Sequence, residues 1–397
     1  MTGRERVLAA FRHRAPDRTP FFEKLVKPPC SDVVLGRPHA AVNFEYRMQR
    51  LADDDWRGLV EQEAQDEFDL ARILDFDMIR LGPNIGPDYP RPIRLADHTW
   101  RVGDTVHSLH PDSEVVESWP ADRDRGWRPD PAEDETERLR WTEADYEPPG
   151  WTDDHFYVFR RVRQLMAEAG LDLAIFCSCY TMPVAALRPV QLLWFTDRPD
   201  ALHRFYEKQS QFAVDMGRRA VAEGAHVIGL GGDLACDKGP IISPRHYREF
   251  VVPHVARQAA AMHALGVPVT NASDGNLWPL LDLFLLDTGV DGFEEIDYAA
   301  GMDLAALRAR YPQMTFIGNM DCRYILTRGT REQVRQATFD CLDKGRSAAG
   351  GPGGHVLMSS NCIHKDVKPE SFFVMVAAYR EYWGRPALDL PPVTPSP

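Results

Sequence analysis

Four polar residues at the end of a short apolar run are the part of the sequence best suited to chemistry. The run covers residues 267–270, and Asn271, Ser273, Asp274 and Asn276 follow it. A hydroxyl and two amides bind substrates by hydrogen bonds, and the carboxylate is in addition a metal ligand. We therefore predict that this segment ends at a binding site, with or without a metal.

Seven further apolar runs end in the same way, at residues 21–22, 76–81, 171–178, 226–232, 291–296, 314–319 and 355–360. The polar side chains at their ends are Glu23 and Lys24; Asp77; Cys177, Cys179 and Tyr180; Asp233, Cys236 and Asp237; Glu294 and Glu295; Asn319, Asp321 and Cys322; and Asn361, Cys362 and His364. Glu294 and Glu295 are adjacent, so in a continuing strand only one of them would face the site. Because loops are polar in general, a single polar residue after a strand indicates little. The functional indication is that all eight runs end in such residues.

The elements that position these side chains are predicted to form a (β/α)8 TIM barrel, of the α/β class. Continuous apolar runs separated by amphipathic helical segments indicate parallel strands covered on both faces. Eight such strands are the number that closes a barrel, whose chemistry lies at the carboxyl ends of the strands. The polar ends listed above would then meet in one mouth.

One long segment does not fit this alternation of strands and helices. Residues 86–150 contain a hairpin pattern at 98–110 and a charged stretch with prolines, and they lie between the second and third predicted strands. We expect residues 1–385 to form a single barrel domain with this insertion, and the Pro-rich residues 386–397 to form a loosely ordered tail.

The charge and composition of the chain argue against a nucleic-acid-binding protein and against a membrane protein. The net charge of −13 argues against nucleic-acid binding, which needs a basic face. No apolar run approaches the roughly 20 residues of a membrane span, and the amino-terminal segment has no apolar signal region. We expect a soluble cytoplasmic protein. The seven cysteines are scattered along a long chain, which favours reduced thiols.

Several segments resemble the uroporphyrinogen decarboxylase superfamily, which includes the methyltransferases of corrinoid and coenzyme M systems. They are RERVLAAFRHRAPDRTP, SPRHYREFVVPH, GNMDCRYILTRGTREQV and SSNCIHKDVKPESFFVMV. Outside the insertion the resemblance covers nearly the whole chain. It implies a (β/α)8 barrel with its site at the carboxyl ends of the strands, and it suggests a homodimer.

The resemblance is closer to the methyltransferase branch than to the true decarboxylases. Those decarboxylases grip an anionic porphyrinogen with an arginine-rich segment after the first strand, where this chain reads FFEKLVKPPCSD and has no arginine. Their aspartate on the second strand is matched by Asp77, but their histidine after the eighth strand is matched by Asn361. These losses disfavour haem-pathway decarboxylation.

The methyltransferase branch binds zinc through a His-x-Cys after the fifth strand and a Cys after the eighth. Here Asn271 and Ser273 take the first two places, and Cys362 keeps the third. A zinc site would have to be rebuilt from Asp274 and Cys362 with one more carboxylate, for which the candidates are Asp237, Glu295 and Glu23. The alternative is a metal-free pocket in which Ser273, Asp274 and Asn276 bind the substrate.

The function implied by this resemblance is removal of a methyl group from a small O- or S-methyl compound and its delivery to a corrinoid protein or a thiol. Such a reaction needs a proton donor or a Lewis acid, because the leaving group is poor. We expect acid–base chemistry from Asp77, Asp237, Asp274 and His364, and Asp274 and Cys362 are the expected ligands of a metal, if one is bound. The remaining candidates are expected to bind substrate: Glu23, Lys24, Cys177, Tyr180, Asp233, Asn271, Ser273, Asn276, Glu295, Asn319, Asp321 and Asn361.

The alternative is a cofactor-free decarboxylase or other lyase acting on a small carboxylic acid. Asp77 would then stabilise a developing cation, and Lys24 or Lys238 would have to bind the carboxylate. A carboxylate crowded by Asp274 or Asp321 would have a raised pKa, which suits a proton donor in either reaction.

Overall fold

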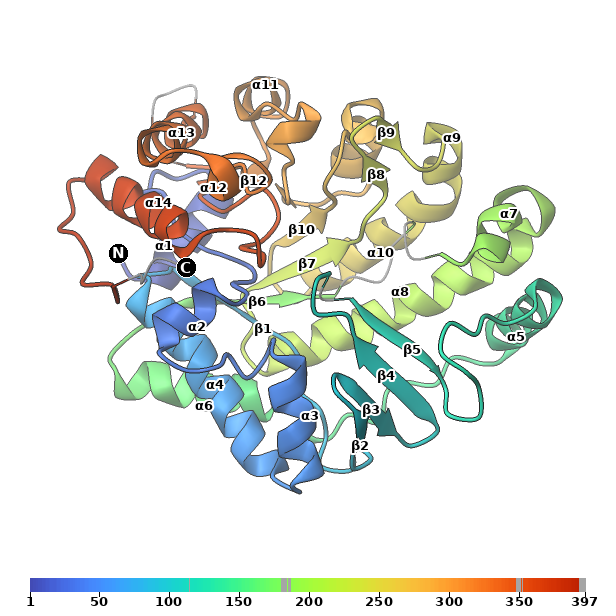
Figure 1. The fold of residues 1–397 in the computed structure, drawn as a ribbon. Coiled ribbons are helices and arrows are strands. Elements are labelled where there is room, and N and C mark those ends of the chain that lie inside the picture. The colour runs from blue at the N-terminus through green and yellow to red at the C-terminus, as the bar shows by residue number, and fades with distance from the viewer. Residues whose placement is uncertain (114, 180–183, 185–186, 348–350, 352, 393–397) are drawn as a thin grey trace.

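Seven parallel strands form a curled sheet at the centre of the protein (Figure 1). The structure is a computed structural model, and it describes residues 1–113, 115–179, 184, 187–347, 351 and 353–392. Along the sheet the strands are β1 (Met78–Leu81), β6 (Ala174–Ser178), β7 (Val227–Gly231), β10 (Val269–Ala272), β11 (Gly292–Glu294), β12 (Thr315–Ile317) and β13 (His355–Val356). Each of them lies within a run that the sequence predicted to be a strand, except that β10 continues to Ala272, two residues past its predicted run.

The eighth predicted strand, at Phe21 and Phe22, closes the ring. Phe21 forms a parallel bridge with Leu357, just after β13, and the Phe22 amide donates to the Leu357 carbonyl at 3.0 Å. On the other side the Asp77 amide, just before β1, donates to the Phe21 carbonyl at 2.8 Å. The sheet is therefore a barrel whose first strand is short, and the predicted fold class is confirmed.

Helices surround the barrel, as expected for strands with two buried faces (Figure 1). The α-helices are α1 (Gly3–Phe11), α2 (Cys30–Leu35), α3 (Phe44–Ala52), α4 (Trp56–Ile73), α5 (Pro131–Glu143), α6 (Tyr157–Glu168), α7 (Pro189–Asp197), α8 (Pro199–Ala222), α9 (Pro244–His246), α10 (Val252–His263), α11 (Leu304–Arg310), α12 (Ile325–Arg328), α13 (Arg331–Lys344) and α14 (Pro369–Tyr382). Single turns of 3-10 helix lie at η1 (Asp153–Phe156), η3 (Trp278–Leu280) and η5 (Tyr298–Ala300), and π-helical turns lie at η2 (Tyr247–Val251) and η4 (Asp282–Asp287).

Helix α1 closes the amino-terminal end of the barrel. The Arg4 amide donates to the Asp172 carbonyl ahead of β6, and the Gly354 amide ahead of β13 donates to the Ala10 carbonyl. Above this plug the barrel interior is filled by a separate apolar cluster that includes Phe22, Met78 and Phe176. With one end plugged and the interior packed, chemistry is left to the carboxyl end, as in other barrels of this type.

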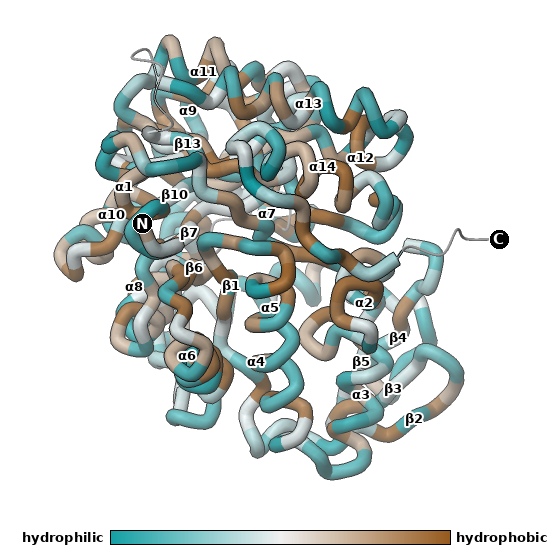
Figure 2. The backbone as a smooth tube through the Cα atoms, turned by 90° about the vertical axis from the view of Figure 1, so that its left-hand side faces the viewer, coloured by the Kyte–Doolittle hydropathy of each residue, from teal (hydrophilic) through white to brown (hydrophobic). Residues whose placement is uncertain are grey.

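The insertion contains a four-stranded antiparallel sheet beside α3 (Figure 2). Its strands are β2 (Ile93–Ala96), β3 (Thr99–Val102), β4 (Thr105–Leu109) and β5 (Val116–Pro120), and the hairpin predicted at 98–110 is the β3–β4 pair. Trp100 is buried against Met48 and Leu51 of α3. The tip of the β4–β5 hairpin reaches the rim of the barrel mouth, where the Lys365 ammonium donates to the Asp112 carbonyl.

The segment after α14 is partly packed against the barrel. After α14, Leu388 and Leu390 pack against the main core, so part of the predicted tail is held to the barrel. Within the described residues no helix is long and apolar enough to cross a membrane. The homodimer and the division into domains stay predictions.

Candidate functional site at the barrel mouth

An open cavity of about 680 Å³ lies at the carboxyl ends of four successive strands, β10 to β13. Its volume is in the range of small-molecule sites. The cavity is lined by residues from the loops that follow each of these strands: Asp274, Asp297, Cys322, Arg323, Thr327, Arg328, Ser360, Asn361, His364 and Asp366. The sequence predicted three of them as site residues, Asp274, Asn361 and His364, and the structure brings these together.

Asp274 is the half-buried acid of this cavity. The Asn361 amide donates to one of its carboxylate oxygens at 3.3 Å. Burial raises the pKa of Asp274, and the nearby charges of Asp233 and Asp297 raise it further. A carboxyl that holds its proton more tightly than usual is suited to proton donation, as the sequence suggested.

Arg323 is the cation at the centre of the site, and sequence reasoning missed it. Its guanidinium donates to both oxygens of Asp237 at 2.8 Å and to Asp297 at 3.2 Å. Asp237 lies in the turn of a small hairpin formed by β8 (Ala235–Cys236) and β9 (Gly239–Pro240). Arg323 thus ties this hairpin to the loop after β12 across the mouth. The predicted acid–base group Asp237 is an exposed partner in an ion pair.

Glu23 is buried, and with Lys24 and Arg80 it lines a separate cavity of about 20 Å³ rather than the mouth cavity. Its two carboxyl oxygens accept from the Ser359 amide at 2.8 Å and from the Ser359 hydroxyl at 2.6 Å. The next residue, Ser360, lines the cavity. Burial raises the pKa of Glu23 to about 8, which outweighs the hydrogen bonds from Ser359 and the charge of Lys24. At neutral pH this carboxyl carries a proton.

Lys24 points between two glutamates. Its ammonium forms ion pairs with Glu294, at 3.5 Å, and with Glu295. Both carboxylates reach it because Glu295 has a φ of 63°, which ends the strand and turns its side chain to the same side as that of Glu294. Both side chains turn to Lys24 and neither lines the mouth cavity, so the expectation that one of the two faces the mouth is corrected. Burial lowers the pKa of Lys24, although the charge of Glu294 opposes the shift.

The thiols and the imidazole of the mouth are engaged within the protein. The Cys322 sulfur lies 3.3 Å from the Ser360 hydroxyl, and burial raises the pKa of Cys362 to about 12, so that this thiol is neutral. His364 uses both ring nitrogens: Nδ1 lies 3.3 Å from the Asp366 amide, which donates to it, and Nε2 lies 3.1 Å from the Cys322 carbonyl. An acid–base role for His364 would require one of these bonds to break.

Asp77 lies at the opposite end of the barrel from the cavity. It precedes β1, accepts from the Phe21 amide at 2.8 Å and forms ion pairs at 2.5 Å with Arg6 of the α1 plug and with Arg18. The expectation that Asp77 supplies acid–base chemistry at the mouth is corrected, because it stands at the start of its strand rather than at the end. Its role in the structure is to join the plug to the barrel.

Three other predicted residues are fully buried away from the cavity. The Asn271 amide donates to the Phe284 carbonyl at 3.0 Å on the helical side of β10, and the Ser273 hydroxyl accepts from the Leu234 amide at 3.1 Å. Cys177 belongs to the main core outside the barrel.

Two more predicted residues, Asn276 and Asp233, do not line the mouth cavity either. The Asn276 side-chain oxygen accepts from the Trp278 amide at 3.1 Å, and Asp233 is exposed near Asp274. Tyr180 lies outside the described residues.

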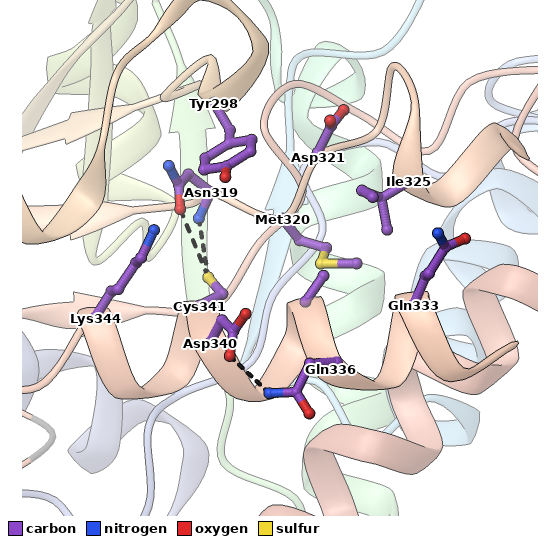
Figure 3. Close-up of a pocket in the computed structure, with 11 residues that line it drawn as sticks. Tyr298, Asn319, Met320, Asp321, Ile325, Gln333, Gln336, Asp340, Cys341 and Lys344 are labelled. Atoms are coloured by element: carbon purple, nitrogen blue, oxygen red, sulfur yellow. Dashed lines mark hydrogen bonds between the residues drawn. The ribbon is translucent and has the colours of Figure 1, made fainter. Parts of the chain in front are cut away.

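Asn319 and Asp321 face a second cavity, of about 270 Å³, behind the loop after β12 (Figure 3). It lies against one face of α13 and is not part of the mouth. Asn319 donates to the Met302 carbonyl at 3.0 Å, and one oxygen of Asp321 accepts from the Arg323 and Tyr324 amides. These two predicted substrate ligands therefore shape the loop that carries Arg323.

The residues present do not fit the zinc site that the resemblance implies. In the described part of the chain, no group of three or more His, Cys, Asp or Glu side chains is placed to hold a metal ion. Asn271 and Ser273, at two of the three zinc positions of the family, carry side chains that are not good zinc ligands and that are used in internal hydrogen bonds, so Cys362 alone of the three keeps a zinc-binding side chain. We derive no chemistry through zinc.

Comparison with known proteins agrees with the fold and with the sequence resemblance. Residues 189–382 match the family model of uroporphyrinogen decarboxylase (URO-D). These residues form a URO-D family domain. The match covers every residue that lines the mouth cavity, and the superfamily recognised in the sequence is confirmed.

Two of the similar proteins are methyltransferases. A methylated-thiol–coenzyme M methyltransferase from Methanosarcina mazei is 26% identical over 157 residues, which is 40% of this chain and 40% of that protein. The chain thus matches about two fifths of that relative's length. A solved methyltransferase structure from Methanosarcina mazei superposes with a TM-score of 0.65 at 16% identity, covering 96% of this chain and 99% of its own, which shows the shared fold. A D-psicose 3-epimerase from Clostridium cellulolyticum H10, with a TM-score of 0.35 at 14% identity over 65% of this chain and 93% of its own, supports no inference.

Proposed function

We propose that this protein is a methyltransferase that removes a methyl group from a small O- or S-methyl compound and passes it to a thiol or to a corrinoid protein. The observation that carries the proposal is the 26% identity to a protein named for methyl transfer between thiols. The mouth cavity supports it, because the cavity is large enough for a small methyl donor and is lined by Ser360, whose neighbour Ser359 contacts the protonated Glu23.

The chemistry of the proposal balances with groups of this chain and the two substrates. The acceptor attacks the methyl carbon, as a thiolate that has released its proton to solvent where the acceptor is a thiol, and the bond from that carbon to oxygen or sulfur breaks with its electron pair on the heteroatom. An alkoxide or thiolate leaves slowly unless it receives a proton. Glu23 holds that proton at neutral pH, and the Ser359 hydroxyl beside it would carry it toward the cavity. Glu23 would regain its proton from solvent between turnovers.

The surrounding charges explain how Glu23 remains protonated. The ammonium of Lys24, its sequence neighbour, would favour the ionised form of Glu23, but Glu294 and Glu295 neutralise that ammonium. With the cation compensated, burial decides the pKa of Glu23. In this proposal the pair of glutamates therefore supports the proton donor through Lys24.

The alternative reaction, decarboxylation of a small acid, is less well supported by the geometry. It would need Lys24 or Lys238 to bind the substrate carboxylate. Lys24 is held by two glutamates, and Lys238 is exposed in the turn of the β8–β9 hairpin and does not line the cavity. Methyl transfer is therefore the function that we propose.

The test is a mass-spectrometric assay with trideuteromethyl ethers and thioethers as donors and a thiol or reduced cobalamin as acceptor. We expect transfer of the label, and a loss of rate by roughly 100- to 10,000-fold in Glu23→Gln, the usual contribution of a general acid. Glu332→Gln, on the exposed face of α13, is the matched control and should keep the wild-type rate. Release of carbon dioxide from acids, with no label transferred to any acceptor, would instead establish the lyase.

A further inference from the structure

The wall of the mouth cavity formed by the segment from Cys322 to Arg328 carries two arginines. Arg323 stands near its start and Arg328 is the last residue of α12. The Thr327 hydroxyl donates to the Arg323 carbonyl at 2.6 Å, which holds the turn between them. Arg323, Thr327 and Arg328 all line the cavity.

The two guanidinium groups differ in how far their charge is compensated. Arg323 forms ion pairs with the carboxylates of Asp237 and Asp297, so its positive charge is compensated within the protein. Arg328 pairs with no carboxylate of the described chain. Its contact is with the ring of Tyr324, whose centre lies 5.9 Å from the guanidinium carbon. A guanidinium that stacks on an aromatic ring keeps its N–H groups free for a planar anion such as a carboxylate.

The charges of the cavity leave an anion one favourable place. Three carboxyl groups line the cavity. Asp297 is paired with Arg323 and Asp366 lies 3.9 Å from the Lys365 ammonium, whereas Asp274 lies near the charges of Asp233 and Asp297, so the side below the β10 loop is the less favourable one for a negative group. Arg328 attracts one, because its charge is paired with no carboxylate of the described chain. An anionic ligand is therefore oriented as well as held, with its charge at α12 and its uncharged part toward the rest of the cavity.

We propose that a molecule bound in the mouth cavity carries a carboxylate or a similar oxyanion, and that Arg328 binds this group. This proposal names the class of substrate for the proposed methyl transfer. It rests on that proposed function, because only methyl transfer defines a methyl donor and a methyl acceptor. The anion belongs either to the methyl donor or to a thiol acceptor.

Calorimetric titration of the full chain tests the proposal without turnover. The probes are (methylthio)acetate against (methylthio)acetamide for the donor, and mercaptoacetate against 2-mercaptoethanol for the acceptor. We expect at least one acid to bind more tightly than its neutral partner, and Arg328→Gln to weaken that acid roughly tenfold while leaving the neutral compound unchanged. Arg328→Lys should recover part of the affinity, since it restores the charge without the planar fork.

Arg331→Gln is the matched control, because Arg331 is a neighbouring exposed arginine at the start of α13 that does not line the cavity. An effect on (methylthio)acetate alone assigns the anion to the donor, and an effect on mercaptoacetate alone assigns it to the acceptor. The proposal is overturned if neither acid binds saturably, if acids and neutral compounds bind equally, or if Arg331→Gln weakens the acid as much as Arg328→Gln. Because binding is measured without methyl transfer, an inactive protein that still selects acids through Arg328 would contradict only the proposed function.

Discussion

Replacing Glu23 by glutamine should make the protein more stable in alkali. The neutral amide resembles the protonated acid: its oxygen accepts from the Ser359 amide, and its NH₂ group donates to the Ser359 hydroxyl. The substitution therefore keeps the contacts of the form that Glu23 has at neutral pH, and it removes the possibility of ionisation. At pH 5, where Glu23 is protonated in the folded protein, the two proteins should have nearly the same free energy of unfolding.

The expected size of the effect follows from the pKa of Glu23, which burial raises from 4.5 to about 8. Between these two pH values the folded state holds a proton that the unfolded state has released, so the stability of the wild type falls as pH rises. One pKa unit corresponds to about 1.4 kcal/mol, so the full shift sets an upper figure of about 5 kcal/mol, reached above pH 8. Glu23→Gln should gain a large part of this relative to the wild type.

The assay is urea denaturation from pH 5 to pH 9, followed by the fluorescence of the nine tryptophans. The quantity of interest is the difference in unfolding free energy between Glu23→Gln and wild type at each pH, because other titrating groups cancel in it. Glu332→Gln, at an exposed site, should show no such trend. A difference for Glu23→Gln that stays constant from pH 5 to pH 9 would refute the raised pKa, and with it the proton donor.

Three further outcomes are expected from the structure. Asp77→Asn leaves Arg6 and Arg18 without a buried counter-charge, so it should lower the unfolding free energy by roughly 3–5 kcal/mol in urea titrations, and an unchanged stability would contradict the anchoring role. In timed iodoacetamide labelling at pH 7.5, exposed Cys236 should react well before Cys362, whose pKa burial raises to about 12; equal rates would show that Cys362 is not held as a neutral thiol. Elemental analysis of protein prepared without chelator should find substoichiometric zinc, and one zinc per chain would show a ligand set other than those described.

The barrel could be predicted from the sequence because its strands are buried on both faces. Such strands read as apolar runs, and every one of the predicted runs contains a strand or, at Phe21, the bridge that closes the ring. The insertion was visible for the opposite reason, since residues 98–110 alternate as a half-exposed hairpin does. The spacing of apolar residues along the sequence was therefore enough to predict the fold.

The site was only partly predictable, because a position beside a strand does not fix the direction of a side chain. Asp77 stands at the start of its run and so lies at the plugged end, whereas Asp274 follows its strand and reaches the cavity. Asn271 is one residue too early and points to the helices. Glu295 reaches Lys24 only because the backbone turns there to a positive φ, for which a glutamate gives no signal. Arg323 was missed because its ion pairs join loops far apart in the sequence.

The closure of the barrel between its first and last strands has a consequence for synthesis on the ribosome. Glu23 and its partner Ser359 are 336 residues apart in the sequence. The first and last strands of the barrel, which lie beside these two residues, are therefore also far apart along the chain. At about 5–20 residues per second, the partner of the first strand emerges roughly 20–70 s after it. During this time the segment at Phe21 and Phe22 and the growing edge of the sheet stay unpaired and apolar. The nascent chain is therefore a natural client for chaperones until β13 is made, because an open sheet with an unpaired apolar edge is prone to aggregate.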